Sequence, residues 1–184
     1  MLSLHFNPFP VLETERLVLR NLTKEDKYDL FEIRSNPTTM QYIPRPIAKT
    51  VDDVSQLIDI ILGYTATNER INWAVTEKGN DKLIGFIGYP NFKHESLRAE
   101  IGYMLNPNYT GKGIAYEALK AIIDYGFNTI GLHSIEAIIR TENKASVKLI
   151  EKAGFVKEAH FKDYIFHNGQ FYDEFVYSLI APNV

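Results

Sequence analysis

Alternating apolar and polar residues in the first half of the chain predict strands, and apolar residues three and four positions apart predict helices between them. Residues 16–20 alternate as a strand does. One helix is expected over residues 23–34, where the Ser-Asn-Pro sequence at 35–37 ends it, and a second over about 51–64. Three β-rich runs follow at 72–76, 83–89 and 99–105, which predicts an antiparallel meander.

The second half of the chain predicts two more helices and three more strands. An apolar stripe indicates a helix over residues 113–127, and a buried strand is expected at 134–139. A further helix over 142–153 ends at Gly154, and Asn168-Gly169 turns a hairpin made of 164–166 and 171–179. This order predicts an α/β, or mixed α+β, fold in which helices cover both faces of a mixed sheet.

The composition and charge of the chain exclude several classes of protein. The 184 residues are 45% hydrophobic, which suits one domain with a core over about residues 11–180. The chain has no cysteine, which excludes disulfides and thiol catalysis and favours the cytoplasm. Twenty basic residues stand against 23 acidic ones without a basic run, so we expect no nucleic-acid partner. There is no leader or apolar stretch typical of membrane insertion, and no histidine spacing typical of a metal site.

The segment between residues 106 and 115 joins a strand to a helix and contains Gly111 and Gly113 at the helix start. Small residues there let backbone N–H groups turn toward a phosphate at the positive end of the helix. Asn106 and Gly113 do not fit a Walker loop, and Tyr116 does not fit a dinucleotide fingerprint. The alternative is that the two glycines only shape a tight turn.

Five segments in register resemble the GNAT N-acetyltransferases, and most closely the branch of ribosomal-protein N-terminal acetyltransferases. They include the Ala-Glu-Ile-Gly-Tyr-Met-Leu run at 99–105, the Gly-Lys-Gly-Ile-Ala loop at 111–115 and the Glu-Asn-Lys-Ala-Ser run at 142–146. The other segments lie at residues 12–20 and 83–88, with Glu117-Ala118-Leu119 and residues 151–155 extending the loop and helix motifs. The resemblance implies a GNAT fold: a mostly antiparallel mixed sheet of six to seven strands, with about four flanking helices. Its fourth and fifth strands, here residues 99–105 and 134–139, are expected to splay apart.

The resemblance also implies that acetyl-CoA is the co-substrate and that it lies in the splay. Thr110 stands where the family loop usually has Arg or Gln, which leaves the backbone donors unchanged. The residues expected to contact the cofactor are Tyr103, Met104, Leu105, Thr110, Gly111, Lys112, Gly113, Ile114, Ala115, Asn143 and Ser146.

Two side chains are expected to carry the chemistry. Glu100 matches the family glutamate that serves as general base, directly or through water; the alternative is a solvated carboxylate paired with Arg98. The helix tyrosine that many GNAT enzymes use as general acid is missing, since Leu149-Ile150 stands in its place. Ser146, three residues after Asn143, matches the acid of the ribosomal branch; the alternatives are a helix cap for Asn143 and a solvated Ser146. A backbone N–H near Met104 or Leu105 is expected to bind the oxyanion.

The expected reaction is direct transfer of acetyl to a primary amine, and a protein N-terminus is the favoured acceptor. Freeing an α-amine of pKa about 7.7 to 8.0 at neutral pH costs on the order of 1.4 kcal/mol, whereas a lysine near 10.4 costs about 4.6 kcal/mol. A small amine, such as an antibiotic, polyamine or amino acid derivative, is the alternative acceptor. A module that binds acetyl-CoA without turnover is the alternative class, and both a monomer and a homodimer fit the sequence.

Overall fold

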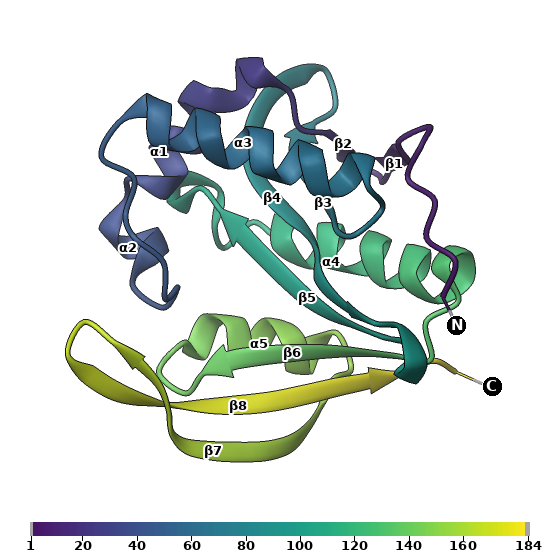
Figure 1. Cartoon of the computed structure of the whole chain (residues 1–184), viewed down its shortest axis with the longest axis vertical. Coiled ribbons are helices and arrows are strands. Elements are labelled where there is room, and N and C mark those ends of the chain that lie inside the picture. The colour runs from purple at the N-terminus through teal and green to yellow at the C-terminus, as the bar shows by residue number, and fades with distance from the viewer. Residues whose placement is uncertain (1, 183–184) are drawn as a thin grey trace.

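An eight-stranded sheet forms the centre of this computed structural model, which describes residues 2–182 (Figure 1). The strands lie in the order β1-β2-β3-β4-β5-β6-β8-β7, and all neighbours are antiparallel except β5 and β6. Their bounds are β1 Leu12–Glu13, β2 Leu17–Asn21, β3 Ile71–Glu77, β4 Asn80–Lys93, β5 Arg98–Leu105, β6 Ser134–Arg140, β7 Val156–His167 and β8 Gln170–Ile180.

The parallel strands β5 and β6 pair over three residues and then separate. Their register ends where Glu100 of β5 lies opposite Glu136 of β6. β5 continues beside β4 to Leu105, while β6 continues beside β8 to Arg140. Figure 1 shows the two strands diverging from their shared beginning. Residues 101–105 and 137–140 therefore have no strand partner, within the described part of the chain, on the edges that face each other. We call the gap between these two edges the seam, and it confirms the expected splay.

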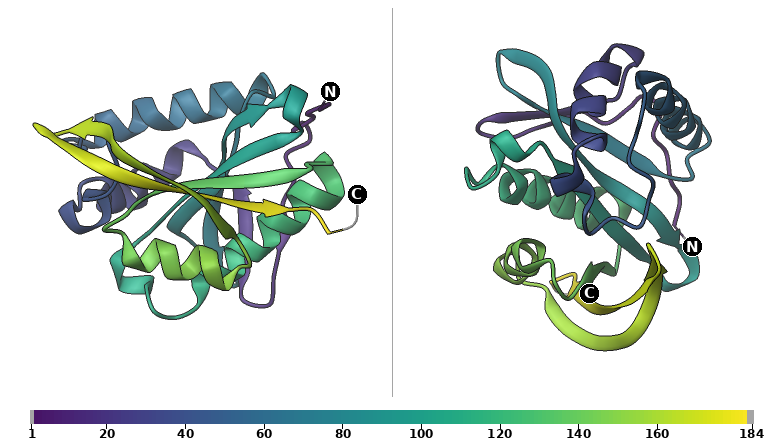
Figure 2. Two further views of the ribbon diagram at one scale, coloured as in Figure 1. Left: turned by 90° about the horizontal axis from the view of Figure 1, so that it is seen from below. Right: turned by 90° about the vertical axis from the view of Figure 1, so that its left-hand side faces the viewer.

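Helices cover both faces of the sheet (Figure 2). α1 (Lys27–Arg34), α2 (Pro37–Met40) and α3 (Val51–Ala66) belong to one side, and α4 (Ile114–Tyr125) and α5 (Lys144–Lys152) to the other. Strand alternation divides the core accordingly: Ala74 packs in the cluster under α1 and α3, whereas Trp73 packs in the cluster under α4. Short 3-10 segments lie at Lys24–Asp26, His94–Ser96 and Pro107–Tyr109, and a π-helical turn at Gly126–Ile130 continues α4.

Local sequence explains where the longest helix begins. Thr50 is the N-cap of α3, and its hydroxyl accepts a hydrogen bond from the Asp53 N–H at 3.2 Å. The Asp53 carboxylate in turn accepts from the Thr50 N–H at 2.9 Å, which completes a capping box. Val54 and Ile58 are buried one turn apart, as the three-and-four spacing predicts.

The mixed α+β fold is confirmed, but the sheet has eight strands instead of six to seven, and there are five helices instead of four. β1 adds a two-residue edge strand, and β7 extends far beyond the expected 164–166 because irregular pairing between Phe161 and Ile165 interrupts its alternation. Asn36-Pro37 ends α1 and also starts α2, since the Asn36 side chain caps Thr38 and proline suits the first turn.

No helix within residues 2–182 combines the length and the apolar character that crossing a lipid bilayer requires.

Candidate active site

The loop before α4 presents free backbone donors at the positive end of a twelve-residue helix. Gly111 and Gly113 have φ angles of 74° and 80°, in the left-handed region that favours glycine, and Gly113 is the N-cap of α4. Among the described residues, the N–H groups of 111–113 have no hydrogen-bond acceptor. Thr110 lies just before them and turns its hydroxyl to the Pro107 carbonyl at 2.8 Å. The geometry suits an anion held by backbone N–H groups without a basic side chain at 110.

An ion pair that the sequence analysis did not identify fixes this loop to the sheet. Glu117, in the first turn of α4, accepts hydrogen bonds from the Thr14 hydroxyl at 2.6 Å and from the Arg16 N–H at 2.8 Å. Its other carboxylate oxygen lies 2.6 Å from the Arg16 guanidinium, which also donates to the Lys112 carbonyl at 3.0 Å. The Arg16–Glu117 pair therefore holds both ends of the glycine turn.

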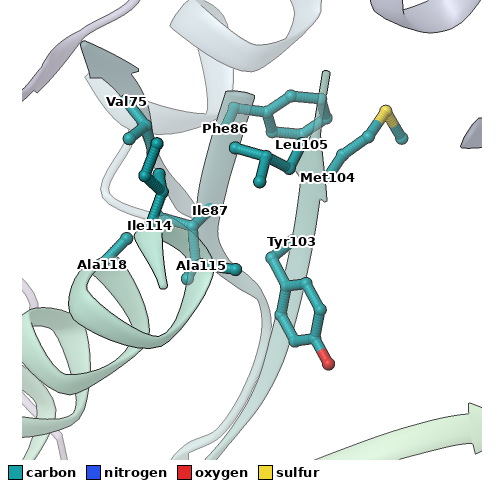
Figure 3. A pocket seen from close by; sticks show the side chains of 9 residues that line it. All are labelled: Val75, Phe86, Ile87, Tyr103, Met104, Leu105, Ile114, Ala115 and Ala118. Carbon is teal, nitrogen blue, oxygen red and sulfur yellow. The ribbon is translucent and has the colours of Figure 1, made fainter. Parts of the chain in front are cut away.

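An apolar pocket lies between β4, β5 and the start of α4 (Figure 3). Five of the residues expected to contact the cofactor meet here: Tyr103, Met104, Leu105, Ile114 and Ala115. The remaining wall is formed by Val75, Phe86, Ile87 and Ala118. Met104 packs in the cluster under α1 and α3, so its side chain lies on the other face of the sheet from the Tyr103 ring.

Tyr103 and Ser146 face each other on the side of the sheet covered by α4 and α5. The Tyr103 hydroxyl is fully buried and makes no hydrogen bond of normal length within residues 2–182; Ser146 is the polar side chain that lies against it. Burial raises the pKa of Tyr103 to about 12, and the Ser146 hydroxyl partly offsets that increase. Figure 3 shows the ring extending away from Leu105, with the oxygen at its far end.

Asn143 has the capping role that the sequence analysis left open as an alternative. Its side-chain oxygen accepts a hydrogen bond from the Ser146 N–H at 3.1 Å at the start of α5. This contact places Ser146 in the first turn of α5, half-buried and directed toward β5. The amide nitrogen of Asn143 keeps its two N–H donors, so capping does not exclude contact with a cofactor.

Glu100 lies on the opposite face of the sheet from Tyr103 and Ser146. Burial raises the pKa of its carboxyl, and the nearby negative charge of Glu136 raises it further, while Lys93, the Asn91 amide and Arg45 lower it. Arg98 is not its partner, because that guanidinium donates to the Ser134 hydroxyl at 2.7 Å and lies 3.5 Å from Glu136.

Glu136 is paired with two basic side chains and therefore plays a structural part. It is only 3% exposed, and Lys93 Nζ lies 2.6 Å from one of its carboxylate oxygens. With Arg98 on the other oxygen, this carboxylate connects β4, β5 and β6 where the seam begins. Glu100, at the beginning of the seam, makes no ion pair within residues 2–182, and the Asn91 amide is its hydrogen-bonding neighbour.

Two further charged residues that the sequence analysis missed lie on the same face as Glu100. Glu174 of β8 is 8% exposed, and burial raises the pKa of its carboxyl, as does the charge of Glu100, while Arg140 opposes the increase. Arg140 is the register partner of Glu174; its guanidinium lies 3.3 Å from the centre of the Tyr172 ring and 3.4 Å from the Gln41 carbonyl. Strand alternation alone could have indicated their shared face, but the pairing of β6 with β8 could not be read from the sequence.

The predicted residues therefore form two groups on either side of the seam. The glycine loop, Tyr103, Ser146 and Asn143 lie toward α4 and α5, and Glu100 lies toward α1 and α3. Within residues 2–182 no three His, Asp or Glu side chains are arranged to hold a metal ion. The arrangement suits an extended ligand that enters with a phosphate group at α4 and meets a second reactant beside Glu100.

Comparison with known proteins agrees with this arrangement. Residues 16–156 match the family model described as an acetyltransferase (GNAT) domain. The uncharacterized N-acetyltransferase YoaA of Bacillus subtilis is 34% identical over 174 residues, which cover 95% of this chain and 98% of YoaA. The spermidine N(1)-acetyltransferase of Vibrio cholerae is 27% identical over 158 residues, covering 86% of this chain and 89% of that protein.

Two solved structures are also similar. A GNAT-family acetyltransferase from Bacillus anthracis has a TM-score of 0.84 at 32% identity and covers 93% of this chain, with 98% of its own length. The ribosomal-protein-S5-alanine acetyltransferase from Vibrio fischeri has a TM-score of 0.78 at 26% identity, covering 93% of this chain and 96% of its own.

Proposed function

The chain belongs to the GNAT acetyltransferase family, and on this basis we propose that it transfers acetyl from acetyl-CoA directly to the α-amine of a protein or peptide N-terminus. The observation that carries the proposal is the seam, which has the glycine loop and Tyr103 on one side and Glu100 on the other. A donor and an acceptor that enter from opposite faces meet between β5 and β6.

The residues present fit acetyl-CoA. The free N–H groups of 111–113 and the positive end of α4 suit its pyrophosphate, and the unpaired edges of the seam suit the amides of its extended arm. The apolar side chains of Leu105 and Ala115 offer a surface against which the methylene groups near the sulfur can pack. Bound there, acetyl-CoA supplies an activated thioester.

Glu100 is placed to accept the proton that the amine loses as it attacks. Burial and the charge of Glu136 raise the pKa of its carboxyl, which makes it a stronger base than an ordinary glutamate. The chain has no cysteine, so no acyl-cysteine can form, and holding both reactants in the seam allows direct transfer. A backbone N–H of Met104 or Leu105 is the proposed donor to the oxyanion.

The acceptor assignment rests on the acidity of the amine. The pKa of an α-amine lies about one unit above neutral pH, so a single carboxylate such as Glu100 suffices to deprotonate it. Deprotonating a lysine at neutral pH costs about 3 kcal/mol more. Arg140 is buried on the same face, and its Nε makes no hydrogen bond within residues 2–182, although it lies 3.9 Å from the Glu142 carboxylate. This guanidinium suits a peptide carbonyl that follows the reacting amine.

A polyamine is the second candidate acceptor, because a specific pair of carboxylates favours it. Glu100 and Glu174 share one face of the sheet, and the negative charge of Glu100 raises the pKa of the Glu174 carboxyl. A second ammonium group beside Glu174 would relieve that repulsion while the first reacts at Glu100. The similar protein from Vibrio cholerae is named for spermidine.

The test is thiol release from acetyl-CoA, with mass detection of the product, on three matched acceptors: a peptide with a free N-terminus, the same peptide blocked at its N-terminus but carrying a lysine, and spermidine. We expect acetylation of the free peptide and none of the blocked one. Turnover of spermidine alone would show that the acceptor is a polyamine and not a peptide N-terminus. CoA binding without release on any acceptor would overturn both.

The variant Glu174→Gln sharpens the choice. It removes the second carboxylate and leaves Glu100 in place, so the KM for a diamine should rise at least severalfold while the KM for a peptide changes little. The matched control is Glu158→Gln on β7. The Glu158 carboxylate accepts a hydrogen bond from the Ser178 hydroxyl and is not among the charges that shift the pKa of Glu100 or Glu174.

A further inference from the structure

The Tyr103 hydroxyl is a buried polar group that the proposed reaction leaves without a role. It makes no hydrogen bond of normal length within residues 2–182, although buried hydroxyl groups are nearly always bonded. The ring is held among apolar side chains of β4 and α4, so the hydroxyl is fixed in direction (Figure 3). The Ser146 hydroxyl lies against the phenol oxygen and lowers the pKa of Tyr103, as a donor to that oxygen does. The phenol proton therefore has no acceptor among the described residues, which is typical of a group that meets its partner only when a ligand is bound.

The position of Tyr103 relative to Glu100 indicates which part of a ligand it meets. Tyr103 follows Glu100 by three residues on β5, so the two side chains leave the strand on opposite faces. Glu100 is the last residue of β5 that pairs with β6, and Tyr103 lies three residues further on, where β5 has lost that neighbour. If the amine is on the side of Glu100, the group that departs from the acetyl carbon is on the side of Tyr103 and Ser146.

Resting on the proposed function, we propose that the Tyr103 hydroxyl donates a hydrogen bond to the sulfur of the departing CoA thiolate, and that Ser146 orients that hydroxyl. Tyr103 thereby supplies a hydroxyl donor to a chain that has Leu149-Ile150 where the resemblance implies a helix tyrosine. Ser146, expected from the sequence to be the general acid, becomes a positioning residue.

Tyr103 keeps its proton throughout the acetyl transfer. The amine nitrogen forms a bond to the acetyl carbon, the carbon–sulfur bond breaks, and its electron pair stays on sulfur. The amine proton goes to Glu100, directly or through water, and the thiolate takes a proton from solvent after it leaves. With a pKa of about 12, Tyr103 is a far weaker acid than a thiol of about 8.5, so it stabilises the thiolate as a donor and does not protonate it.

The first measurement is the pKa of the thiol of bound CoA, which is obtained by titration from the ultraviolet absorbance of the thiolate. A hydrogen bond to the thiolate lowers that pKa below the value for free CoA. Tyr103→Phe keeps the ring and removes the donor, and it should raise the pKa of the bound thiol by about one unit, a tenfold change in ionisation. Ser146→Ala should raise it by less.

Tyr125→Phe is the matched control. Tyr125 is a buried tyrosine of α4 whose ring packs against Trp73, 5.3 Å between centroids, away from the seam. It should leave the thiol pKa unchanged. Equal melting temperatures and CoA dissociation constants for the two Tyr→Phe variants establish that both are folded and bind.

The second measurement uses acetyl thioesters whose thiols differ in acidity. Tyr103→Phe should lower kcat about tenfold with acetyl-CoA and much less with a thioester of a more acidic thiol, which needs little stabilisation. An unchanged thiol pKa in Tyr103→Phe, or a shift caused by Ser146→Ala alone, would overturn the inference. Failure of the wild-type protein to bind CoA would instead overturn the proposed function as well, and the titration separates the two because it requires no acceptor.

Discussion

Replacing Glu117 by alanine tests whether the Arg16–Glu117 pair holds the glycine loop. The substitution removes the acceptor of the Thr14 hydroxyl and the Arg16 N–H, together with the ion pair to the guanidinium. Each hydrogen bond to this partly buried carboxylate is worth about 1 kcal/mol, and the ion pair about 0.5 kcal/mol because Arg16 is half exposed.

The free energy of unfolding should therefore fall by about 2.5 kcal/mol. For a chain of this length the melting temperature should drop by about 5 to 10 °C. Chemical denaturation at neutral pH measures the first quantity and calorimetry the second. CoA binding should also weaken, by roughly threefold to tenfold, since the donors at 111–113 lose their fixed orientation.

The pH dependence of the difference between wild type and variant has a defined sign. Burial alone raises the pKa of Glu117, but the bonds from Thr14 and Arg16 outweigh it and hold the pKa below its ordinary value. A carboxyl whose pKa is lowered by folding contributes stability above its unfolded pKa and loses it as the pH falls through the folded pKa. The stability difference between the variant and the wild type should therefore be full above the ordinary glutamate pKa of about 4.3 and shrink as the pH falls through the lower folded pKa of Glu117.

Lys120→Ala is the control, because Lys120 is exposed on the same helix and outside the network; it should change stability by less than about 0.5 kcal/mol. The double variant with Arg16→Ala should destabilise less than the sum of the single changes. Strict additivity, or a Glu117→Ala protein as stable as the wild type, would refute the argument.

Two further predictions concern the base and the loop. Glu100→Gln should lower kcat/KM roughly 100-fold and remove the acidic limb of the pH profile, which reflects protonation of a carboxyl with a raised pKa; an unchanged rate from pH 6 to 9 would exclude Glu100 as the base. Gly113→Ala and Gly111→Ala should each cost about 1 kcal/mol of stability, because φ is positive at both, and each should weaken CoA binding severalfold by titration; wild-type affinity in both would contradict the role of the loop.

The periodicity of apolar residues was sufficient to predict the bounds of the helices whose apolar residues all face one core. α3 and α4 lie close to where their apolar stripes predict them, since each stripe meets one face of the sheet. β7 was largely missed, because most of its residues are exposed and its pairing is irregular, so burial imposes no pattern on it.

The candidate site was predictable where a motif is local and unpredictable where the fold brings distant residues together. The glycine loop and Glu100 could be found from short segments. Arg16 and Glu117 are 101 residues apart, and Glu174 meets Glu100 only because β8 pairs with β6. Tyr103 was expected to contact the cofactor, but its unpartnered hydroxyl depends on what packs around it.

The seam also allows ligand binding to be followed through the exchange of backbone amide protons in the sheet. Amide protons on the facing edges of 101–105 and 137–140 have no strand partner, so in the free protein they exchange with solvent faster than their neighbours. A ligand that bonds to those edges protects them before any chemistry takes place. Hydrogen exchange along these two short segments therefore follows loading and product departure as separate events, with no label on either substrate.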